Sequence, residues 1–247
     1  MGRAIGEIAA TDDDLNYRVA LDDAGHPAFS QKIEGFPEAR EINAENLQGV
    51  AGLIDFSLPP ATMKVLALCV EKKIPMVIGT TGFDDAQLAE IKAASETIPI
   101  LMSSNMSVGV NLLFALTRAA AKALKGKGYD AEMYEIHHKH KKDAPSGTAK
   151  TLEEIILEHH DASEPVYGRA GHTGERRQEE LGSFALRGGD VVGDHTVFFL
   201  GSGERIELKH QAVSRSTFAG GAVSALKFLA KKEPGFYSMA DVLNLEF

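Results

Sequence analysis

The sequence predicts an α/β protein with two parts: a Rossmann-like dinucleotide-binding domain and an α+β domain with a mostly open mixed sheet. Two observations support this fold class. Between residues 50 and 102, short apolar runs typical of buried strands alternate with helical patterns, as they do around a parallel sheet. Between residues 125 and 215, four further strand patterns accompany one helical pattern, and we expect these strands to form a second sheet.

The composition is typical of a globular protein and argues against several classes of function. The 247 residues are 44% hydrophobic and 25% charged, with a formal net charge of -9 at pH 7. The acidic balance argues against a nucleic-acid groove. No stretch approaches the roughly 20 apolar residues that span a bilayer. Asp12, Asp13 and Asp14 follow the N-terminus without an apolar signal region, so we expect a cytoplasmic protein with no membrane or nucleic-acid partner.

The single cysteine, Cys69, lies in an apolar helical pattern at residues 65–70. One cysteine cannot form an internal disulfide. We therefore expect a buried structural thiol rather than a nucleophile.

The chain begins with a pattern like the end of a glycine-rich phosphate loop that runs into a helix. Gly2 and Arg3 precede apolar positions at Ile5 and Ile8, which have helical spacing. A dinucleotide fingerprint needs a strand and a tight glycine turn ahead of that helix, and no strand pattern precedes Gly2. We therefore expect the first strand to be missing, sheet edges to be exposed and stability to be poor.

The next strand pattern, at residues 17–21, ends at two acidic residues, Asp22 and Asp23. A carboxylate at this position can accept hydrogen bonds from the adenosine ribose hydroxyls, so Asp22 is a candidate cofactor ligand. The carboxylate of Asp23 would repel a 2′-phosphate, which favours NADH over NADPH. The alternative, that Asp22 to Gly25 form only a turn, stays open.

Three further strand patterns each end in a polar loop, and helical patterns separate them. The strands lie at residues 50–56, 75–78 and 98–102, and the helices at 61–71 and 84–94. Ligands of doubly wound folds bind at the carboxyl ends of such strands. Two of the loops are Gly79-Thr80-Thr81-Gly82 and Ser103-Ser104-Asn105-Met106. A plain turn stays open as the alternative for the first of them.

The most informative segment, residues 135–148, reads E-I-H-H-K-H-K-K-D-A-P-S-G-T. Alternating apolar residues predict a strand at 131–136 that ends at the histidines. The lysines form a dense positive cluster in an acidic chain, which suits an anion. A solvated basic loop and an adventitious metal site are the alternatives. Zinc is disfavoured because lysines repel a cation and no cysteine is near. The cluster consists of His137, His138, Lys139, His140, Lys141 and Lys142.

A helix is expected directly after this cluster, at residues 149–159. Ser146 and Thr148 can cap it, and Gly147 lets a ligand approach the free backbone N–H groups at its start. These groups favour a carboxylate or a phosphate. The other patterns are helices at 108–124 and 217–231 and strands near 184–187, 196–200 and 205–210. Five more histidines lack the spacing of a metal site: His159, His160, His172, His195 and His210.

The segment H-H-K-H-K-K-D-A-P-S-G-T-A closely resembles the signature of the 4-hydroxy-tetrahydrodipicolinate reductases, also called dihydrodipicolinate reductases. The similarity covers almost the whole chain, because five other blocks occur in the family's order. They are I-D-F-S-L-P at residues 54–59, V-I-G-T-T-G-F at 77–83, S-N-M-S-V-G-V-N at 104–111, G-H-T-G-E-R at 171–176 and S-R-S-T-F-A-G-G-A at 214–222.

The resemblance implies an enzyme that reduces 4-hydroxy-tetrahydrodipicolinate (dihydrodipicolinate) to tetrahydrodipicolinate with NADH or NADPH in lysine and diaminopimelate biosynthesis. It also implies a small dicarboxylate substrate and a homotetramer built on the open sheet. Residues 1–106 and 216–247 would form the dinucleotide-binding domain. Residues 107–215 would form the substrate-binding and oligomerisation domain.

The resemblance further implies roles for residues in the matching motifs. His137 and Lys141 would be the proton-donating pair. The family commonly has an aromatic residue at the position of Met106, and methionine can also pack on a nicotinamide ring. The expected substrate ligands are His138, Gly147 and Thr148. The expected cofactor contacts are Gly2, Arg3, Asp22, Gly79, Thr80, Thr81, Ser103, Ser104, Asn105 and Met106.

Three other functions stay open at this point. The absent first strand is compatible with a cofactor-impaired, non-catalytic relative that acts as a binding protein. A different nicotinamide enzyme of similar build is a second alternative, which the histidine and lysine cluster argues against. A histidine-rich metal-binding protein is the third.

Overall fold

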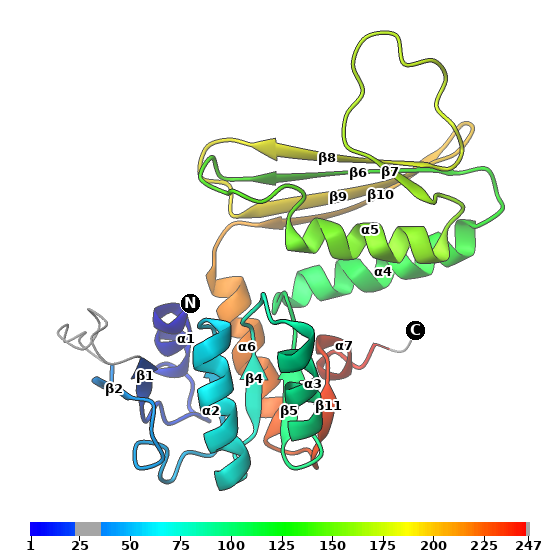
Figure 1. Ribbon diagram of the computed structural model, residues 1–247. Helices are drawn as coiled ribbons and strands as arrows, with labels where there is room; N and C mark the ends of the chain where they lie inside the picture. The colour runs from blue at the N-terminus through cyan, green and yellow to red at the C-terminus, as the bar shows by residue number, and fades with distance from the viewer. Residues whose placement is uncertain (23–35, 246–247) are drawn as a thin grey trace. The chain divides into compact units, whose positions relative to one another are not determined.

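The computed structural model describes residues 1–22 and 36–245, and the chain forms two compact units. The first unit comprises Met1–Val108 and Ser216–Asn244, and the second consists mainly of Gly109–Arg215. Each unit has its own sheet and its own hydrophobic core (Figure 1). Asp23, on which the expected preference for NADH depends, lies outside the described residues.

The first unit is Rossmann-like, as predicted. Its four-stranded sheet is parallel, with the order β11-β5-β4-β3. The strands are β3 (Leu53–Asp55), β4 (Met76–Ile78), β5 (Pro99–Met102) and β11 (Gly235–Tyr237). A separate parallel pair consists of β1 (Ala20–Asp22) and β2 (Ala39–Glu41). Within residues 1–22 and 36–245, no strand connects this pair to β3.

Helices cover both faces of the four-stranded sheet. They are α2 (Pro59–Lys72), α3 (Asp85–Ala94), α6 (Ser216–Leu229) and α7 (Met239–Val242). Helix α1 (Gly2–Ala9) packs against α6. Because side chains alternate along a strand, Met76 and Ile78 pack with α2 and α3, whereas Val77 packs with α6 and α7. The start of α3 is fixed by a capping box between Asp84 and Gln87.

The structure differs from the sequence prediction mainly at very short strands. The strand expected at residues 17–21 begins later, at Ala20, and spans three residues. β2 and β11, which had no predicted counterpart, also span three residues each. So few positions cannot display a recognisable period, and tertiary pairing therefore determines these strands.

The second unit is an α+β unit with a mixed, five-stranded sheet of order β10-β9-β6-β8-β7. Its strands are β6 (Asp130–His137), β7 (Glu164–Val166), β8 (Glu180–Arg187), β9 (Gly193–Leu200) and β10 (Arg205–Ala212). β6 lies in the middle, parallel to β8 and antiparallel to β9. Helices α4 (Val108–Leu124) and α5 (Gly147–His159) both lie along one face of the sheet (Figure 1).

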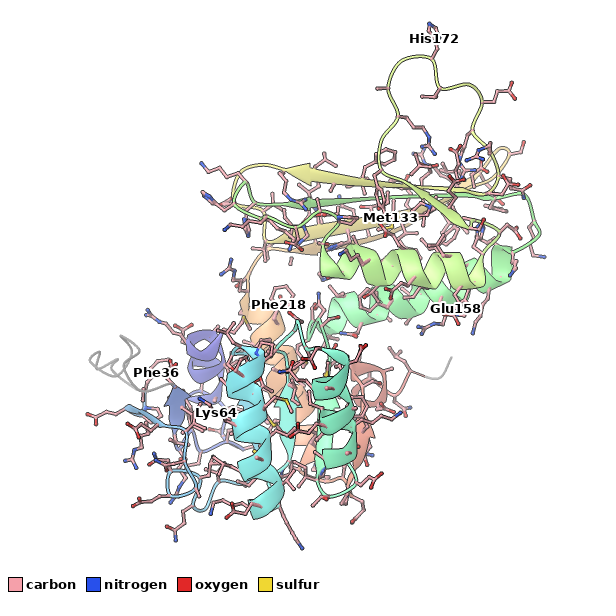
Figure 2. The ribbon with its side chains drawn as sticks, viewed as in Figure 1. Phe36, Lys64, Met133, Glu158, His172 and Phe218 are labelled. Carbon is pink, nitrogen blue, oxygen red and sulfur yellow. The ribbon has the colours of Figure 1, made fainter. Side chains whose placement is uncertain are left out.

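The predicted mostly open sheet is confirmed by the burial of alternate residues along β6. Ala131, Met133, Glu135 and His137 are buried, and the residues between them are partly exposed. Met133, labelled in Figure 2, is 1% exposed and belongs to the core of this unit. The alternation places Glu135 and His137 on the covered face, near the start of α5.

A close helix contact in the first unit gives a test of this fold. Gly221 in α6 packs against the loop that follows β5, and a β-carbon at this position would overlap the carbonyl oxygen of Met106. We expect Gly221→Ala to lower the free energy of unfolding by about 1–3 kcal/mol, since backbone atoms cannot move aside easily. Urea unfolding monitored by circular dichroism measures this change.

Gly220 provides the matched control, because it precedes Gly221 in the same helix. A β-carbon at Gly220 would meet only Ile8, at 3.9 Å. Gly220→Ala should therefore leave stability unchanged or raise it by up to about 1 kcal/mol through better helix propensity. Equal stabilities of the two variants would contradict the packing of α6 described here.

Candidate active site

The candidate site is built around two side chains on β6. Glu135 and His137 are two residues apart and therefore point to the same face of the sheet. Their exposed fractions are 1% and 8%. The Oε2 atom of Glu135 forms a short hydrogen bond with Nδ1 of His137. A buried carboxylate thus lies directly against the imidazole.

Two further elements bind the same carboxylate. Arg187, at the end of β8, donates from Nη1 to Oε2 of Glu135 at 2.9 Å and from Nη2 to Oε1 at 2.8 Å. The backbone N–H of Ser146 donates to Oε1 at 3.1 Å. Burial alone raises the pKa of Glu135, but hydrogen bonds from His137 and Arg187 outweigh it and lower this pKa to about 2. Glu135 is therefore ionised at neutral pH.

His195 on β9 completes the cluster. It lies opposite Glu135 in the strand register, and its ring centroid is 5.2 Å from that of His137 in an edge-to-face arrangement. Its Nε2 atom is 3.2 Å from Oγ of Ser146. Burial is the main cause that lowers the pKa of His195, to about 3. His195 is therefore neutral near pH 7 and presents an uncharged ring to His137.

The start of α5 approaches this cluster through Ser146. Its Oγ accepts a hydrogen bond from the backbone N–H of Ala149 at 3.2 Å, so Ser146 is the N-cap, as predicted. Thr148 lies within the first turn rather than at the cap. Gly147 is exposed, and no atom lies within 4 Å of the position that a β-carbon would occupy. The helix N-terminus is thus open to a small anion.

The loop between β6 and α5 is held by the turn that joins β8 and β9. The backbone N–H of His138 donates to the carbonyl of Val191 at 2.8 Å. Nζ of Lys141 lies 3.0 Å from Oδ1 of Asp143. The predicted catalytic and substrate-binding residues all lie in the second unit, at the end of β6, in this loop or at the start of α5. They are His137, His138, Lys141, Gly147 and Thr148.

The predicted cofactor residues belong to the first unit, and several have structural contacts. Asp55, at the end of β3, is buried and accepts hydrogen bonds from the hydroxyls of Ser57 at 2.6 Å, Thr62 at 2.6 Å and Thr80 at 2.7 Å. Thr80 is 4% exposed. Its hydroxyl therefore fixes the loop after β4, and the neighbouring Thr81 is exposed.

The loop after β5 is also internally braced. Ser103 Oγ donates to the carbonyl of Asn105 at 2.8 Å, and Oδ1 of Asn105 accepts from the N–H of Ser107 at 2.9 Å. Ser104 is exposed, whereas the Met106 side chain is 1% exposed and packs in the core. Little of that side chain can meet a ring, so its contact with nicotinamide stays a prediction.

The remaining predicted cofactor residues lie near the start of the chain. Gly2 and Arg3 form the exposed first turn of α1, and Arg3 donates to Glu7 at 3.2 Å. Asp22 is the last residue of β1 and is partly buried. The structure thus places the cofactor candidates of the first unit in four separate segments, of which two follow strands and one ends a strand.

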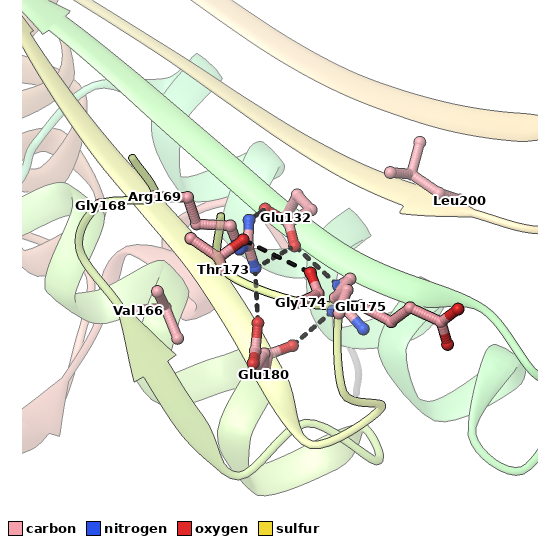
Figure 3. Close-up of a pocket in the computed structure, with 10 residues that line it drawn as sticks. Glu132, Val166, Gly168, Arg169, Thr173, Gly174, Glu175, Glu180 and Leu200 are labelled. Atoms are coloured by element: carbon pink, nitrogen blue, oxygen red, sulfur yellow. Dashed lines mark hydrogen bonds and ion pairs between the residues drawn. The ribbon is translucent and has the colours of Figure 1, made fainter. Parts of the chain in front are cut away.

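Figure 3 shows a pocket on the second unit, and its volume is about 470 Å³. It is lined by Glu132, which points to the open face of the sheet, whereas the Glu135 cluster lies on the covered face. Both arginines that line the pocket are already paired with carboxylates. Arg169 lies 2.8 Å from Glu132 and 3.0 Å from Glu180, and Arg176 lies 2.8 Å from Glu132. This pocket therefore offers no unpaired arginine to an anionic substrate, and we do not assign it to the candidate site.

Several remaining side chains of interest do not form sites. Cys69 is buried, and burial, reinforced by Asp55, raises the pKa of its thiol to about 12, which fits the expected structural thiol. His172 is exposed on the long loop before β8 (Figure 2). Within the described parts of the chain, no three His, Cys, Asp or Glu side chains could hold a metal ion. None of the helices described is both long and apolar enough to cross a membrane.

Sequence analysis missed Glu135, Arg187 and His195 as members of this cluster. Glu135 could have been found from its spacing, because it precedes His137 by two residues on a predicted strand. Arg187 and His195 are brought in by strand register, since they pair with His137 and Glu135 from β8 and β9. The sequence carries no local signal for either pairing.

Comparison with known proteins places the whole chain in one family. A model of the N-terminal region of dihydrodipicolinate reductase matches residues 1–106, and a model of its C-terminal region matches residues 109–243. The 4-hydroxy-tetrahydrodipicolinate reductase of Nitrosomonas europaea is 46% identical over 254 residues, covering 99% of this chain and 94% of the relative. That of Aquifex aeolicus is 48% identical, with coverage of 99% and 95%.

A solved structure has the same fold. It is a dipicolinate-bound dihydrodipicolinate reductase from Paenisporosarcina sp. TG-14, with a TM-score of 0.79 and 21% identity. The match covers 97% of this chain and 94% of that one. Together with the two matching models and the relatives above 40% identity, the agreement leads to one conclusion: the chain belongs to the dihydrodipicolinate reductase family.

Proposed function

We propose that this chain reduces 4-hydroxy-tetrahydrodipicolinate (dihydrodipicolinate) to tetrahydrodipicolinate with NAD(P)H, as a step of lysine and diaminopimelate biosynthesis. Family membership identifies an NAD(P)H-dependent oxidoreductase. One structural observation carries the assignment to a site. His137 and the start of α5 contact the Glu135 carboxylate directly, and Arg187 links this carboxylate to the loop that holds Lys141. No observation favours the alternative of a non-catalytic binding protein.

The substrate side of the proposal rests on charge and on backbone donors. A small cyclic dicarboxylate presents anions that suit Lys141 and the N–H groups of Gly147 and Thr148 at the start of α5. His138, in the same loop, is proposed as a further ligand. The relative from Paenisporosarcina was solved with dipicolinate, which is itself a small cyclic dicarboxylate.

The cofactor side rests on the loops of the first unit. Helix α1 begins at Gly2, where no atom lies within 4 Å of a β-carbon position, so the N–H groups of its first turn can donate hydrogen bonds to a pyrophosphate. Asp22 and the loops after β4 and β5 are proposed to hold the rest of the dinucleotide. NAD(P)H supplies the hydride when it is bound. The residues of the chain therefore have to orient the reactants and supply a proton.

Proton supply is the proposed role of His137 and Lys141. Hydride addition to a conjugated imine leaves negative charge on the ring, and a positioned proton donor typically contributes a factor of about 10²–10⁴. His137 is held by Glu135, and Lys141 lies in the loop that directly follows β6. Both groups are cations when protonated, so they also stabilise the developing negative charge.

The open face of the second sheet supports the proposed homotetramer. It carries Tyr134 and Phe198, whose rings lie 5.7 Å apart, and Leu186, which is 47% exposed. Apolar and aromatic side chains of this kind favour burial against a second copy. A cytoplasmic location stays a prediction.

Loss of either proposed proton donor should lower turnover without weakening cofactor binding. We expect His137→Gln and Lys141→Ala each to lower kcat by about 10²–10⁴, while the Kd for NADH, measured by fluorescence titration, changes little. Lys142→Ala is the control, because Lys142 is exposed beside Lys141 and has no proposed role. Unchanged turnover in both site variants would refute the assignment.

Cofactor preference is tested at Asp23. Replacing this carboxylate by arginine reverses a charge next to the proposed ribose ligand Asp22. Each unit-charge interaction at 4 Å is worth about 1 kcal/mol in water, so Asp23→Arg should shift the NADPH/NADH ratio of kcat/KM by roughly 30-fold towards NADPH. Steady-state kinetics with both cofactors measures the ratio. A ratio that stays the same means that Asp23 does not face the 2′ position.

A further inference from the structure

The proposed function gives no step to the most deeply buried charge of the site. Glu135 is 1% exposed, yet four donor groups reach it: Nδ1 of His137, both Nη atoms of Arg187 and the N–H of Ser146. We propose that Glu135 is a positioning residue that sets the tautomer and direction of the His137 ring, so that Nε2 exchanges the proton. This inference rests on the proposed function of His137.

The first step of the argument concerns the tautomer. An ionised carboxylate can only accept hydrogen bonds. Because its pKa is lowered to about 2, Glu135 stays ionised throughout the neutral range. The ring nitrogen that faces Glu135 must therefore carry a proton, and that nitrogen is Nδ1. In neutral His137, Nε2 then has the free lone pair. Nε2 is therefore the nitrogen that gains and loses the exchanged proton.

The second step concerns rigidity. Arg187 binds both oxygens of Glu135 and also donates to the carbonyls of Asp143 at 2.6 Å and Leu186 at 2.7 Å. The guanidinium is thus anchored on two segments, and the carboxylate is fixed in its plane. Since Arg187 compensates the charge of Glu135, the pair serves mainly to aim the imidazole.

The third step concerns the opposite end of the ring. A β-carbon at Gly193 on β9 would lie 2.9 Å from Nε2 of His137 and 3.4 Å from its Cδ2. The strand therefore has room for the imidazole only because residue 193 lacks a side chain. Glu135 holds the Nδ1 end and Gly193 leaves space for the Nε2 end, so this ring position depends on both residues.

The groups that face His137 come from every neighbouring element. Glu135 lies on its own strand, Arg187 on β8 and His195 on β9, and the charge of Lys141 reaches the cluster from the loop. Burial lowers the pKa of His195 to about 3, so His195 adds no charge near neutral pH. Among these four residues, Glu135 is therefore the one anion that contacts the His137 ring.

Glu135→Gln tests the proposal by replacing the acceptor at Nδ1 with an amide that can donate. We expect kcat to fall by about 10- to 100-fold, while KM for the substrate and Kd for NADH change by less than about threefold. His137→Gln is measured in parallel.

A spectroscopic readout separates positioning from a purely structural role. The ¹⁵N signals of His137, identified in histidine-labelled protein by their absence in His137→Gln, report which nitrogen carries the proton. We expect the Nδ1–H tautomer alone in the wild-type chain and a mixture of both tautomers in Glu135→Gln, because the amide can either accept from Nδ1–H or donate to Nδ1. An Nε2–H tautomer in the wild type would overturn the proposal. So would a Glu135→Gln variant with unchanged kcat beside an impaired His137→Gln.

Gly193→Ala provides a second variant that keeps every charge. Its β-carbon should displace the ring from Glu135 and lower kcat about tenfold or more. Gly188→Ala is the control, because no atom lies within 4 Å of its β-carbon position in the turn before β9. If Glu135→Gln does not fold, the wild-type tautomer and Gly193→Ala decide the question.

The same set distinguishes this inference from the proposed function. Full turnover in His137→Gln would refute the proposed role of His137 in the reaction, and with it the positioning role of Glu135. An impaired His137→Gln with full activity in Gly193→Ala and Glu135→Gln would leave the proposed function standing and remove only the positioning role of Glu135.

Discussion

The buried carboxylate of Glu135 is the interaction on which the second unit's site depends. It joins the middle strand β6 to Arg187 at the end of β8 and to Ser146, the N-cap of α5. An unpaired charge in this position would be strongly unfavourable, and removing one partner of a buried ion pair typically costs about 3–5 kcal/mol. Its contacts with Arg187, Ser146 and His137 offset that cost and at the same time fix the geometry that the chemistry needs.

The first unit uses a comparable arrangement at the end of a strand. Asp55 follows β3 and gathers three hydroxyl groups, one of which belongs to Thr80 in the loop after β4. In both units a buried acid at a strand end therefore organises the neighbouring loop. The difference lies in the donors. Glu135 is bound by cationic or titratable groups, which suits proton transfer, whereas Asp55 is bound by neutral hydroxyls, which suits a fixed scaffold.

Much of the fold could be predicted from local patterns, and the site only in part. The helix at residues 108–124 was predicted with its observed bounds, because a long apolar period is a strong signal. The strand that ends at His137 and the Ser146 cap were also predicted from adjacent residues. Arg187 and His195 could not be, since they reach the cluster through pairing across 50 or more residues of chain, as in Arg187 and Glu135 with a separation of 52. Met106 shows a further limit, because no local pattern indicated that its side chain would be 1% exposed and pack in the core.

The central claim is that this set of residues reduces a cyclic, unsaturated dicarboxylate with NAD(P)H. The most direct measurement is the oxidation of NADH or NADPH by the purified, folded chain after addition of 4-hydroxy-tetrahydrodipicolinate. The account predicts cofactor oxidation that depends on the substrate and yields tetrahydrodipicolinate as the product. A folded chain that binds the cofactor but does not oxidise it in the presence of this substrate would contradict the account.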